Sequence, residues 1–243
     1  MDTPAPPNYG QRLRIGLLIP SVNTVIEPQM QALLPRGVTC HVTRLALAGA
    51  SLEALQAMVA DVESAARLVA DAGVDLIAFH CTAASMLSVA WMESIARRIH
   101  AATQLPATTT GHAVRSALGI LEARRVVLVT PYGEATHARE LAFLAECGVE
   151  VVGDACMKVG SARAYAEQSP QVLERFALEQ RHAAADAYFY GCTAIRSSEI
   201  IASLERQLER PVITSNQVLA WHVMRHAGIA DHVPGYGRLL ARH

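Results

Sequence analysis

The sequence has few aromatic residues and almost no net charge. Of its 243 residues, 5% are Phe, Trp or Tyr, and the 21 Lys and Arg nearly balance the 22 Asp and Glu. Nucleic-acid-binding proteins usually carry a basic surplus, so this balance argues against a nucleic-acid partner and does not favour an anionic membrane surface. Apolar residues make up 51% of the chain, enough for a sizeable core of closely packed helices and sheets.

Long apolar runs are also lacking, because none approaches the roughly 20 residues that a membrane-spanning helix needs. The N-terminus reads MDTPAPPNYGQ and has no basic region followed by an apolar one, as a secretory signal would have. We therefore expect a cytoplasmic protein without a membrane partner. Residues 1–11 are expected to form a flexible, proline-rich lead.

The sequence lacks the cysteine pattern of a disulfide framework or of a zinc finger. The count of five is odd and no CxxC occurs, which favours reduced thiols over a disulfide framework and gives no reason to expect a metal. The five are Cys40, Cys81, Cys147, Cys156 and Cys192.

Short β-rich runs alternate with longer helical stretches along the chain. The predicted strands cover residues 14–19, 75–79, 106–109, 125–130, 149–152, 187–190 and 211–214. The predicted helices cover residues 52–72, 91–103, 112–122, 135–147, 171–185, 198–207 and 218–227. This alternation is typical of parallel sheets with helices on their faces.

The order of elements contains a repeat. IGLLIPS (15–21) resembles VVLVTPY (126–132), DLIAFHCTA resembles AYFYGCTA, and PATTTGHAVRSAL resembles PVITSNQVLAWHV. The prolines of the first pair and the cysteines of the second share one offset of 111 positions (131 − 20 and 192 − 81). We predict two pseudo-symmetric parallel-sheet α/β halves, 12–110 plus 216–243 and 111–215, with the active site in the cleft between them.

Each predicted half ends one strand in Cys-Thr-Ala, at Cys81 and at Cys192. Open α/β sheets bind ligands at the carboxyl ends of their strands, and a helix N-terminus there favours a thiolate. The amides of Thr82, Ala83 and Thr193 are placed to hold a carboxylate or an oxyanion. An ordinary buried thiol is the alternative for any single cysteine, but the matched placement of this pair favours function.

Two thiols that face each other can act on opposite sides of one carbon. One adds to the carbon or removes its proton, and the other gives a proton on the opposite face, so no cofactor is needed. This is the chemistry of cofactor-independent isomerisation and racemisation. The partner would be a small carboxylate or dicarboxylate. Cys40, Cys147 and Cys156 have no such context and are interpreted as structural.

Further polar residues follow predicted strands. Ser21 and Asn23 lie directly after the first strand, where they would bind substrate or cap a helix. Tyr132 is the repeat partner of Ser21, and its phenol would bond an oxyanion or pack against the core. Four other side chains carry weaker signals, with a packed or solvated alternative for each: His80, His112, Arg163 and Arg196.

The motifs together resemble a known group of enzymes. PSVNTVIEP (20–28), Cys81-Thr82, Pro131-Tyr132, GCTAIR (191–196) and VPGYG (233–237) resemble the aspartate/glutamate racemase superfamily, most closely its branch of maleate cis-trans isomerases and arylmalonate decarboxylases. The resemblance runs from about Arg14 to the C-terminus. It implies an aspartate/glutamate racemase-like fold and cofactor-independent conversion of maleate, or an analogue, to the trans isomer.

The resemblance also implies roles for particular residues. Cys81 would attack the double bond, giving a bound thioether or an enediolate, and Cys192 would supply and recover a proton. Carboxylates would be held by side chains and amides of the motif residues. These predicted substrate-binding residues are Ser21, Asn23, Thr82, Ala83, Tyr132, Thr193 and Asn216.

One position departs from the resemblance. Ala162, in KVGSARAYAEQ, stands where maleate isomerases carry an Asn. Unless Ser161 or Arg163 replaces that ligand, the departure leaves open a dicarboxylate other than maleate, or an acid with one carboxylate and a different second group. A second hypothesis is a racemase or epimerase of an amino or hydroxy acid, and a third is a small-acid binder without chemistry. Arylmalonate decarboxylases keep only the second cysteine, so decarboxylation is a minor alternative. A homo-oligomer is expected by default, and residues 160–168 are a candidate lid.

Overall fold

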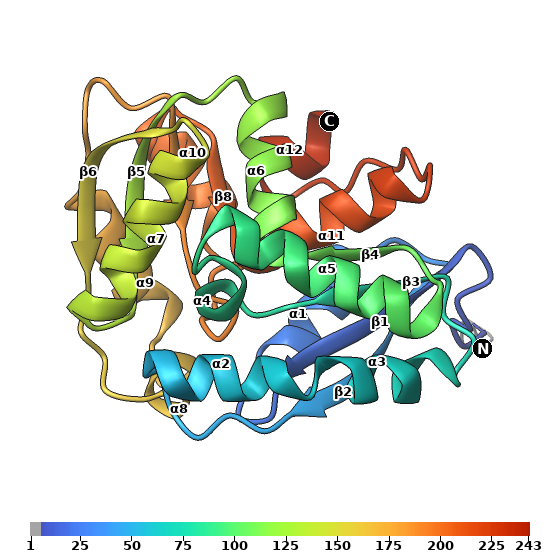
Figure 1. Ribbon diagram of the computed structural model, residues 1–243. Coiled ribbons are helices and arrows are strands. Elements are labelled where there is room, and N and C mark those ends of the chain that lie inside the picture. Colours follow the sequence, from blue (N-terminus) through green and yellow to red (C-terminus); the bar gives the residue numbers. More distant parts are fainter. Residues whose placement is uncertain (1–5) are drawn as a thin grey trace.

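The computed structural model describes residues 6–243, so residues 1–5 of the predicted flexible lead lie outside it (Figure 1). Within the lead, the Asn8 side chain donates a hydrogen bond to the carbonyl of Val38 at 3.0 Å. It also accepts one from the backbone N–H of Gly37 at 3.1 Å. Residue 8 is thus held against the start of the second strand.

Two four-stranded parallel sheets form the scaffold (Figure 1). The first has the order β2-β1-β3-β4, and its strands are β1 (Leu13–Pro20), β2 (Val38–Leu45), β3 (Leu76–Phe79) and β4 (Ala107–Thr109). The second has the order β6-β5-β7-β8, and its strands are β5 (Arg125–Thr130), β6 (Glu150–Cys156), β7 (Ala187–Tyr190) and β8 (Val212–Thr214). The same strand order in both sheets confirms the predicted α/β fold with two related halves.

Helices cover both faces of each sheet, so the central strands are apolar throughout. On β5, Val126 and Leu128 face one core cluster, whereas Val127 and Val129 face the other. The helices are α1 (Ile26–Leu33), α2 (Leu52–Ala60), α3 (Val62–Ala70), α4 (Thr82–Ser85), α5 (Val89–Thr103), α6 (Thr110–Ile120), α7 (Glu134–Glu146), α8 (Ala162–Glu167), α9 (Pro170–Leu178), α10 (Ile201–Leu208), α11 (Ser215–His226) and α12 (Gly237–Arg242).

Several elements differ from the sequence prediction. The edge strand β2 was not predicted, because VTCHVTRL is half polar and only partly buried. The helices α1, α8 and α12 were not predicted either. The predicted helix 52–72 is two helices, α2 and α3, which meet at Asp61, where the backbone has φ −90° and ψ 7°. The predicted helix 171–185 ends at Leu178.

The two halves are connected by helices that begin directly after a strand. Thr109 ends β4 and caps α6 by accepting from the N–H of His112, while the N–H of Thr214 donates to the Gln217 side chain at 3.3 Å at the start of α11. Helices α6 and α11 pack against each other, and α1 packs against α11. The carboxyl ends of the two sheets are thereby brought to one central region.

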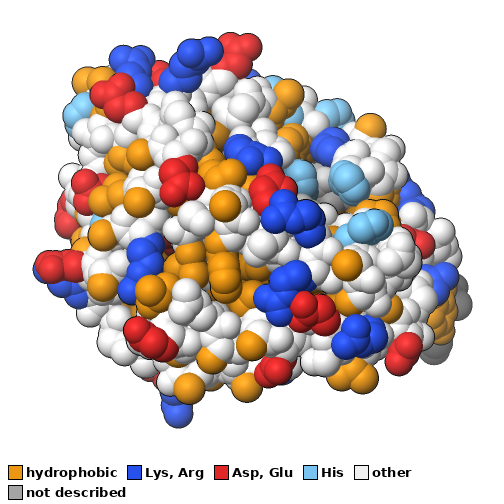
Figure 2. Space-filling view, viewed as in Figure 1, with side chains coloured by type: hydrophobic (Ala, Val, Ile, Leu, Met, Phe, Trp, Pro, Cys, Tyr) orange, Lys and Arg blue, Asp and Glu red, His pale blue; other side chains and the backbone are white. Residues whose placement is uncertain are grey.

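The surface is mixed in charge. On the face seen in Figure 2, acidic and basic side chains are spread around hydrophobic ones that gather near the centre. Among residues 6–243, no helix is long and apolar enough to cross a membrane.

Candidate active site

One cavity of about 420 Å³ lies where the two halves meet. Cys81 and Ala83 reach it from the end of β3, and Cys192 and Thr193 reach it from the end of β7. Asn23 and Tyr132 line it from the turns after β1 and β5. The structure therefore brings six of the nine predicted site residues into one space.

Cys81 is the N-cap residue of α4, with an extended backbone (φ −151°, ψ 112°) and a side chain only 6% exposed. Burial raises the pKa of its thiol to about 12, although the amides of Ala84 and Ala83 act in the opposite direction. Burial thus outweighs the thiolate stabilisation that the sequence prediction assigned to the helix N-terminus. At neutral pH the group is a thiol.

Cys192 adopts a backbone conformation that L-residues rarely occupy, with φ 124°. Its sulfur accepts a hydrogen bond from the N–H of Ala194 at 3.3 Å, and its own N–H donates to Ser215 Oγ at 3.1 Å. Burial raises the pKa of this thiol to about 12 as well, while the Tyr132 hydroxyl and the Ala194 amide lower it. At neutral pH Cys192 is therefore a protonated thiol rather than a preformed thiolate.

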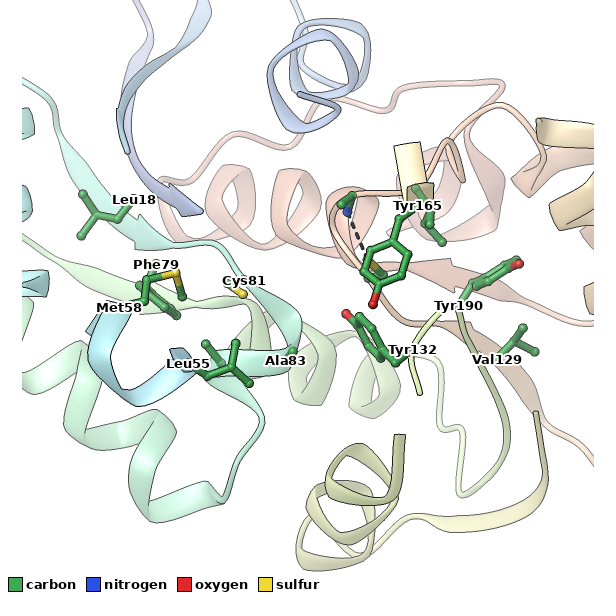
Figure 3. Close-up of a cluster of buried hydrophobic side chains, with 14 of the residues drawn as sticks. Leu18, Leu55, Met58, Phe79, Cys81, Ala83, Val129, Tyr132, Tyr165 and Tyr190 are labelled. Carbon is green, nitrogen blue, oxygen red and sulfur yellow. Dashed lines mark hydrogen bonds between the residues drawn. The ribbon is translucent and has the colours of Figure 1, made fainter. Parts of the chain in front are cut away.

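Tyr132 and Tyr165 form an aromatic pair on the cavity wall. Their ring centroids are 5.8 Å apart with an interplanar angle of 74°, an edge-to-face arrangement. Figure 3 shows the two phenol groups meeting opposite the sulfur of Cys81. Burial, followed by the neighbouring Cys192, raises the pKa of Tyr132 well above its ordinary value. Its phenol therefore stays protonated and can donate a hydrogen bond to an anion.

Asn23 serves both as a helix cap and as part of the cavity wall. Its Oδ1 accepts from the backbone N–H groups of Val25 at 2.9 Å and Ile26 at 3.1 Å, at the start of α1. Its Nδ2 donates to Thr193 Oγ1 at 3.1 Å, across the boundary between the halves. Because the cap fixes the amide oxygen, the NH₂ group is held on the cavity side.

Three of the predicted binding residues do not line the cavity. Ser21 is exposed, and its hydroxyl accepts from the N–H of Leu47 at 3.1 Å, which orients the segment that follows β2. Thr82 is fully buried, and its hydroxyl donates to Ser215 Oγ at 2.8 Å. Asn216 is fully buried as well and belongs to an internal network behind Thr193.

That network fixes the orientation of His80. The Nδ2 of Asn216 donates to the Gln29 side chain at 2.7 Å and to the carbonyl of Thr193 at 3.1 Å, so its Oδ1 is the atom that faces His80 Nε2 at 2.9 Å. His80 Nδ1 lies 2.9 Å from Thr110 Oγ1. Burial lowers the pKa of His80 to about 3, so the ring is neutral, with its proton on Nε2. His80 supports the site and does not touch the cavity.

The outer wall of the cavity is largely apolar. Leu47 and Leu55 line it from one half, and Ala162 and Tyr165 of α8 line it from the other. Ser161 accepts from the N–H of Ala164 and caps α8, so the predicted lid segment is partly helical. Among the described residues, Arg163 is the one Lys or Arg in this lining; its side chain is 90% exposed and pairs with Glu167 at 2.9 Å.

The remaining candidates lie away from the cavity. His112 lies between Thr109 and Glu93, and Arg196 pairs with Glu199 on the surface. His222 and His226 stand at an HxxxH spacing with stacked rings, but within the described part of the chain no group of three His, Cys, Asp or Glu side chains could hold a metal.

Several site residues were missed by sequence reasoning. The rule that strand ends carry ligands, applied to β2, would have found Leu47 and its neighbours, but β2 itself was not predicted. Gln29 and the buried Glu140 follow no strand-end motif, and no sequence signal marked them. Ser215 does follow β8 directly, but sequence reasoning chose its neighbour Asn216.

The sequence is similar to known enzymes over nearly its whole length. The arylmalonate decarboxylase family profile matches residues 15–240. A maleate isomerase of Pseudomonas putida is 26% identical over 245 residues, covering 95% of this chain and 98% of its own. An arylmalonate decarboxylase of Bordetella bronchiseptica is 28% identical over 230 residues, covering 93% and 95%.

Solved structures agree with the sequence matches. The crystal structure of a maleate isomerase from Pseudomonas putida with maleate aligns with a TM-score of 0.90 at 26% identity, covering 94% of this chain and 97% of that one. The two chains therefore share one fold, and the family match spans nearly the whole chain. The chain therefore belongs to the arylmalonate decarboxylase/maleate isomerase family of the Asp/Glu racemase superfamily.

Proposed function

We propose that the protein is a cofactor-independent cis-trans isomerase of a small dicarboxylate, with maleate to fumarate as the first candidate reaction. The observation that carries the proposal is that each half contributes one buried thiol, Cys81 or Cys192, to a single cavity. The relatives named maleate isomerase support the same reaction.

In this mechanism the sulfur of Cys81 adds to one alkene carbon, and negative charge develops on the neighbouring carbon and its carboxylate as an enediolate. Because burial keeps the thiol protonated, attack is coupled to transfer of the Cys81 proton to a bound carboxylate. Cys192 then protonates the neighbouring carbon, and the former double bond becomes a single bond that can rotate.

Reversal of these steps releases the trans acid. The Cys192 thiolate removes a proton from the carbon, the C–S bond breaks, and the sulfur of Cys81 regains its own proton from the carboxylate. Both thiols return to their starting state, so atoms and charge balance without a co-reactant. The Asn23 amide, the Tyr132 phenol and Thr193 are the proposed carboxylate ligands, supported by their places in the cavity lining.

The proposal is tested by proton NMR of maleate with the reduced protein. Fumarate is expected with the wild-type protein and with Cys147→Ser, a matched change at a half-buried thiol outside the cavity. It is not expected with Cys81→Ser or Cys192→Ser. Persistence of maleate with folded, reduced wild-type protein would rule out maleate as the substrate.

A second candidate function is racemisation or epimerisation of a small acid. It is favoured by Ala162, which leaves an apolar wall where the resemblance to maleate isomerases expects an Asn. The two thiols would then exchange one Cα proton. Deuterium from D₂O appearing at Cα of a chiral acid, without alkene conversion, would support this alternative, while release of CO₂ from an arylmalonate would point to decarboxylation.

A further inference from the structure

Glu140, on α7, is a buried carboxyl that the proposed mechanism does not use. The residue is 1% exposed, and within the described structure neither carboxyl oxygen has a hydrogen-bond partner. An unpaired buried carboxyl is costly, because its charged form loses hydration without compensation. Such a group calls for an explanation beyond packing.

The backbone beside Cys192 is adapted to this carboxyl. A Cβ atom at Gly191 would lie 2.5 Å from Glu140 Oε2, so any larger residue there would collide with the carboxyl unless it moved. In the repeat, Gly191 corresponds to His80, whose imidazole is buried next to Cys81. The first half thus carries an imidazole at this position, whereas the second half carries a glycine with a carboxyl from α7 against it.

Glu140 lies close enough to both thiols to affect their charge. Helix α7 packs against α4, which begins directly after Cys81, and the carboxyl also lies beside Gly191, directly before Cys192. Its negative form raises the pKa values of Cys81, Cys192 and Tyr132. Burial raises the pKa of Glu140 itself to about 8.

Other titratable groups around α7 are already engaged. His137, one turn earlier, lies 2.8 Å from Thr130 Oγ1 and 3.0 Å from Asp154 on β6. The Arg139 guanidinium donates to Thr136 Oγ1 at 3.5 Å. Neither group is hydrogen-bonded to Glu140. In the part of the chain that the structure describes, the one basic side chain of the cavity lining is Arg163, which is exposed.

We propose that Glu140 is a positioning residue that sets the charge of the cavity: its carboxyl must carry a proton for an anionic ligand to enter, and the bound anion holds that proton in place. The inference deepens the proposed function and rests on it only in requiring that the ligand be a carboxylate. Ligand binding and Glu140 protonation are then reciprocally coupled, so each favours the other. The described lining of the cavity holds no buried cation, so a dianion could bind there only while Glu140 is protonated.

The test compares two alkylating probes, iodoacetate and iodoacetamide, at Cys81 and Cys192 by peptide mass spectrometry from pH 6 to 9.5. Both probes react with the same thiolate, so the ratio of their rates cancels thiol ionisation and reports the penalty for a carboxylate in the cavity. In the wild-type protein this ratio is expected to fall about tenfold as pH rises through 8, the size of a coupling of one pKa unit. Cys147 and Cys156 serve as internal controls, with a flat ratio.

Three variants test whether Glu140 causes the pH dependence of the rate ratio. The ratio is expected to stay flat with pH in Glu140→Gln and to keep its fall in Glu140→Asp and in His137→Gln. A flat ratio in the wild-type protein overturns the proposal without any variant. A fall of the rate ratio that persists in Glu140→Gln, or that vanishes in His137→Gln, also overturns the proposal. Because neither probe is a substrate, failure of maleate turnover alone would refute the proposed reaction and leave this inference standing.

Discussion

The hydroxyl of Thr82 lies 2.8 Å from the hydroxyl of Ser215, the first residue of α11. The backbone N–H of Cys192 donates to the same Ser215 oxygen at 3.1 Å. One serine thus links the Cys-Thr motif of the first half to the Cys-Thr motif of the second. This link fixes how the two thiols are presented to one cavity.

Replacing Ser215 with alanine is expected to destabilise the protein by about 1–3 kcal/mol, because Cys192 N–H and the Thr82 hydroxyl lose their shared partner in a buried place. Turnover is expected to fall through kcat, since the thiols are less well positioned. Chemical denaturation and steady-state kinetics measure the two effects. Ser197→Ala is the matched control, because the Ser197 hydroxyl is buried but has no hydrogen-bond partner among residues 6–243. Equal costs for the two variants would contradict this role of Ser215.

The backbone at Cys192 predicts an unusual response to substitution. With φ at 124°, any side chain at this position is strained, whereas glycine is not. Cys192→Gly is therefore expected to be more stable than Cys192→Ala by about 1 kcal/mol. Cys81, with φ −151°, is the control, and there Gly is expected to be less stable than Ala. Urea denaturation of the four variants measures both differences, and the same order at the two positions would exclude strain at Cys192.

The sequence sufficed for the architecture and for the centre of the site. The repeat of Cys-Thr-Ala at one offset predicted two related sheets, and both Cys81 and Cys192 do line one cavity. These features were predictable because the motifs follow buried apolar strands directly, so their position depends on local structure and on sheet topology alone.

The supporting residues could not be predicted in this way. Asn216 resembles a ligand by its place after a strand, yet α11 buries it behind Thr193, away from the cavity. Glu140 stands in the middle of a helix, and only the packing of α7 against α4 and Gly191 gives it significance. Such roles depend on contacts between segments distant in sequence, which local patterns do not encode.

Asn216 provides a third prediction. Its side chain joins His80, Gln29 and the carbonyl of Thr193, so Asn216→Ala leaves several buried polar groups unpaired at once. The expected loss of stability is about 2–4 kcal/mol, larger than for a single hydrogen bond. KM is expected to rise as well, because Thr193 is no longer held against Asn23.

A conservative variant separates the hydrogen bonds of Asn216 from its volume. In Asn216→Asp the shape is kept, but the group can no longer donate to Gln29 and Thr193. The variant is expected to lose at least as much stability in urea as Asn216→Ala. Asn8→Ala, which removes an amide at the surface end of β2, is the control and is expected to leave KM unchanged. A stable Asn216→Asp protein would show that packing alone explains the residue.

The fourth prediction concerns how stability depends on pH through Glu140. Its pKa is about 8 in the folded protein, against an ordinary value of 4.5. Below pH 4.5 both states are protonated and the group contributes nothing. Between 4.5 and 8 the unfolded chain releases a proton that the folded chain keeps, so stability falls as pH rises and levels off above 8.

Glu140→Gln removes that titration. The free energy of unfolding of the variant, relative to that of the wild type, is therefore expected to increase by on the order of 4 kcal/mol as pH rises from 5 to 9. Urea denaturation at pH 5, 6.5, 8 and 9 measures the difference between the two proteins. Titration of His80 affects both proteins equally and cancels in that difference. Glu134→Gln, at an exposed position of the same helix paired with Lys158, is expected to follow the wild-type curve at a small constant offset. Parallel curves for wild type and Glu140→Gln would mean that the carboxyl is already charged in the folded protein, and the cavity would then need a different account of how it admits an anion.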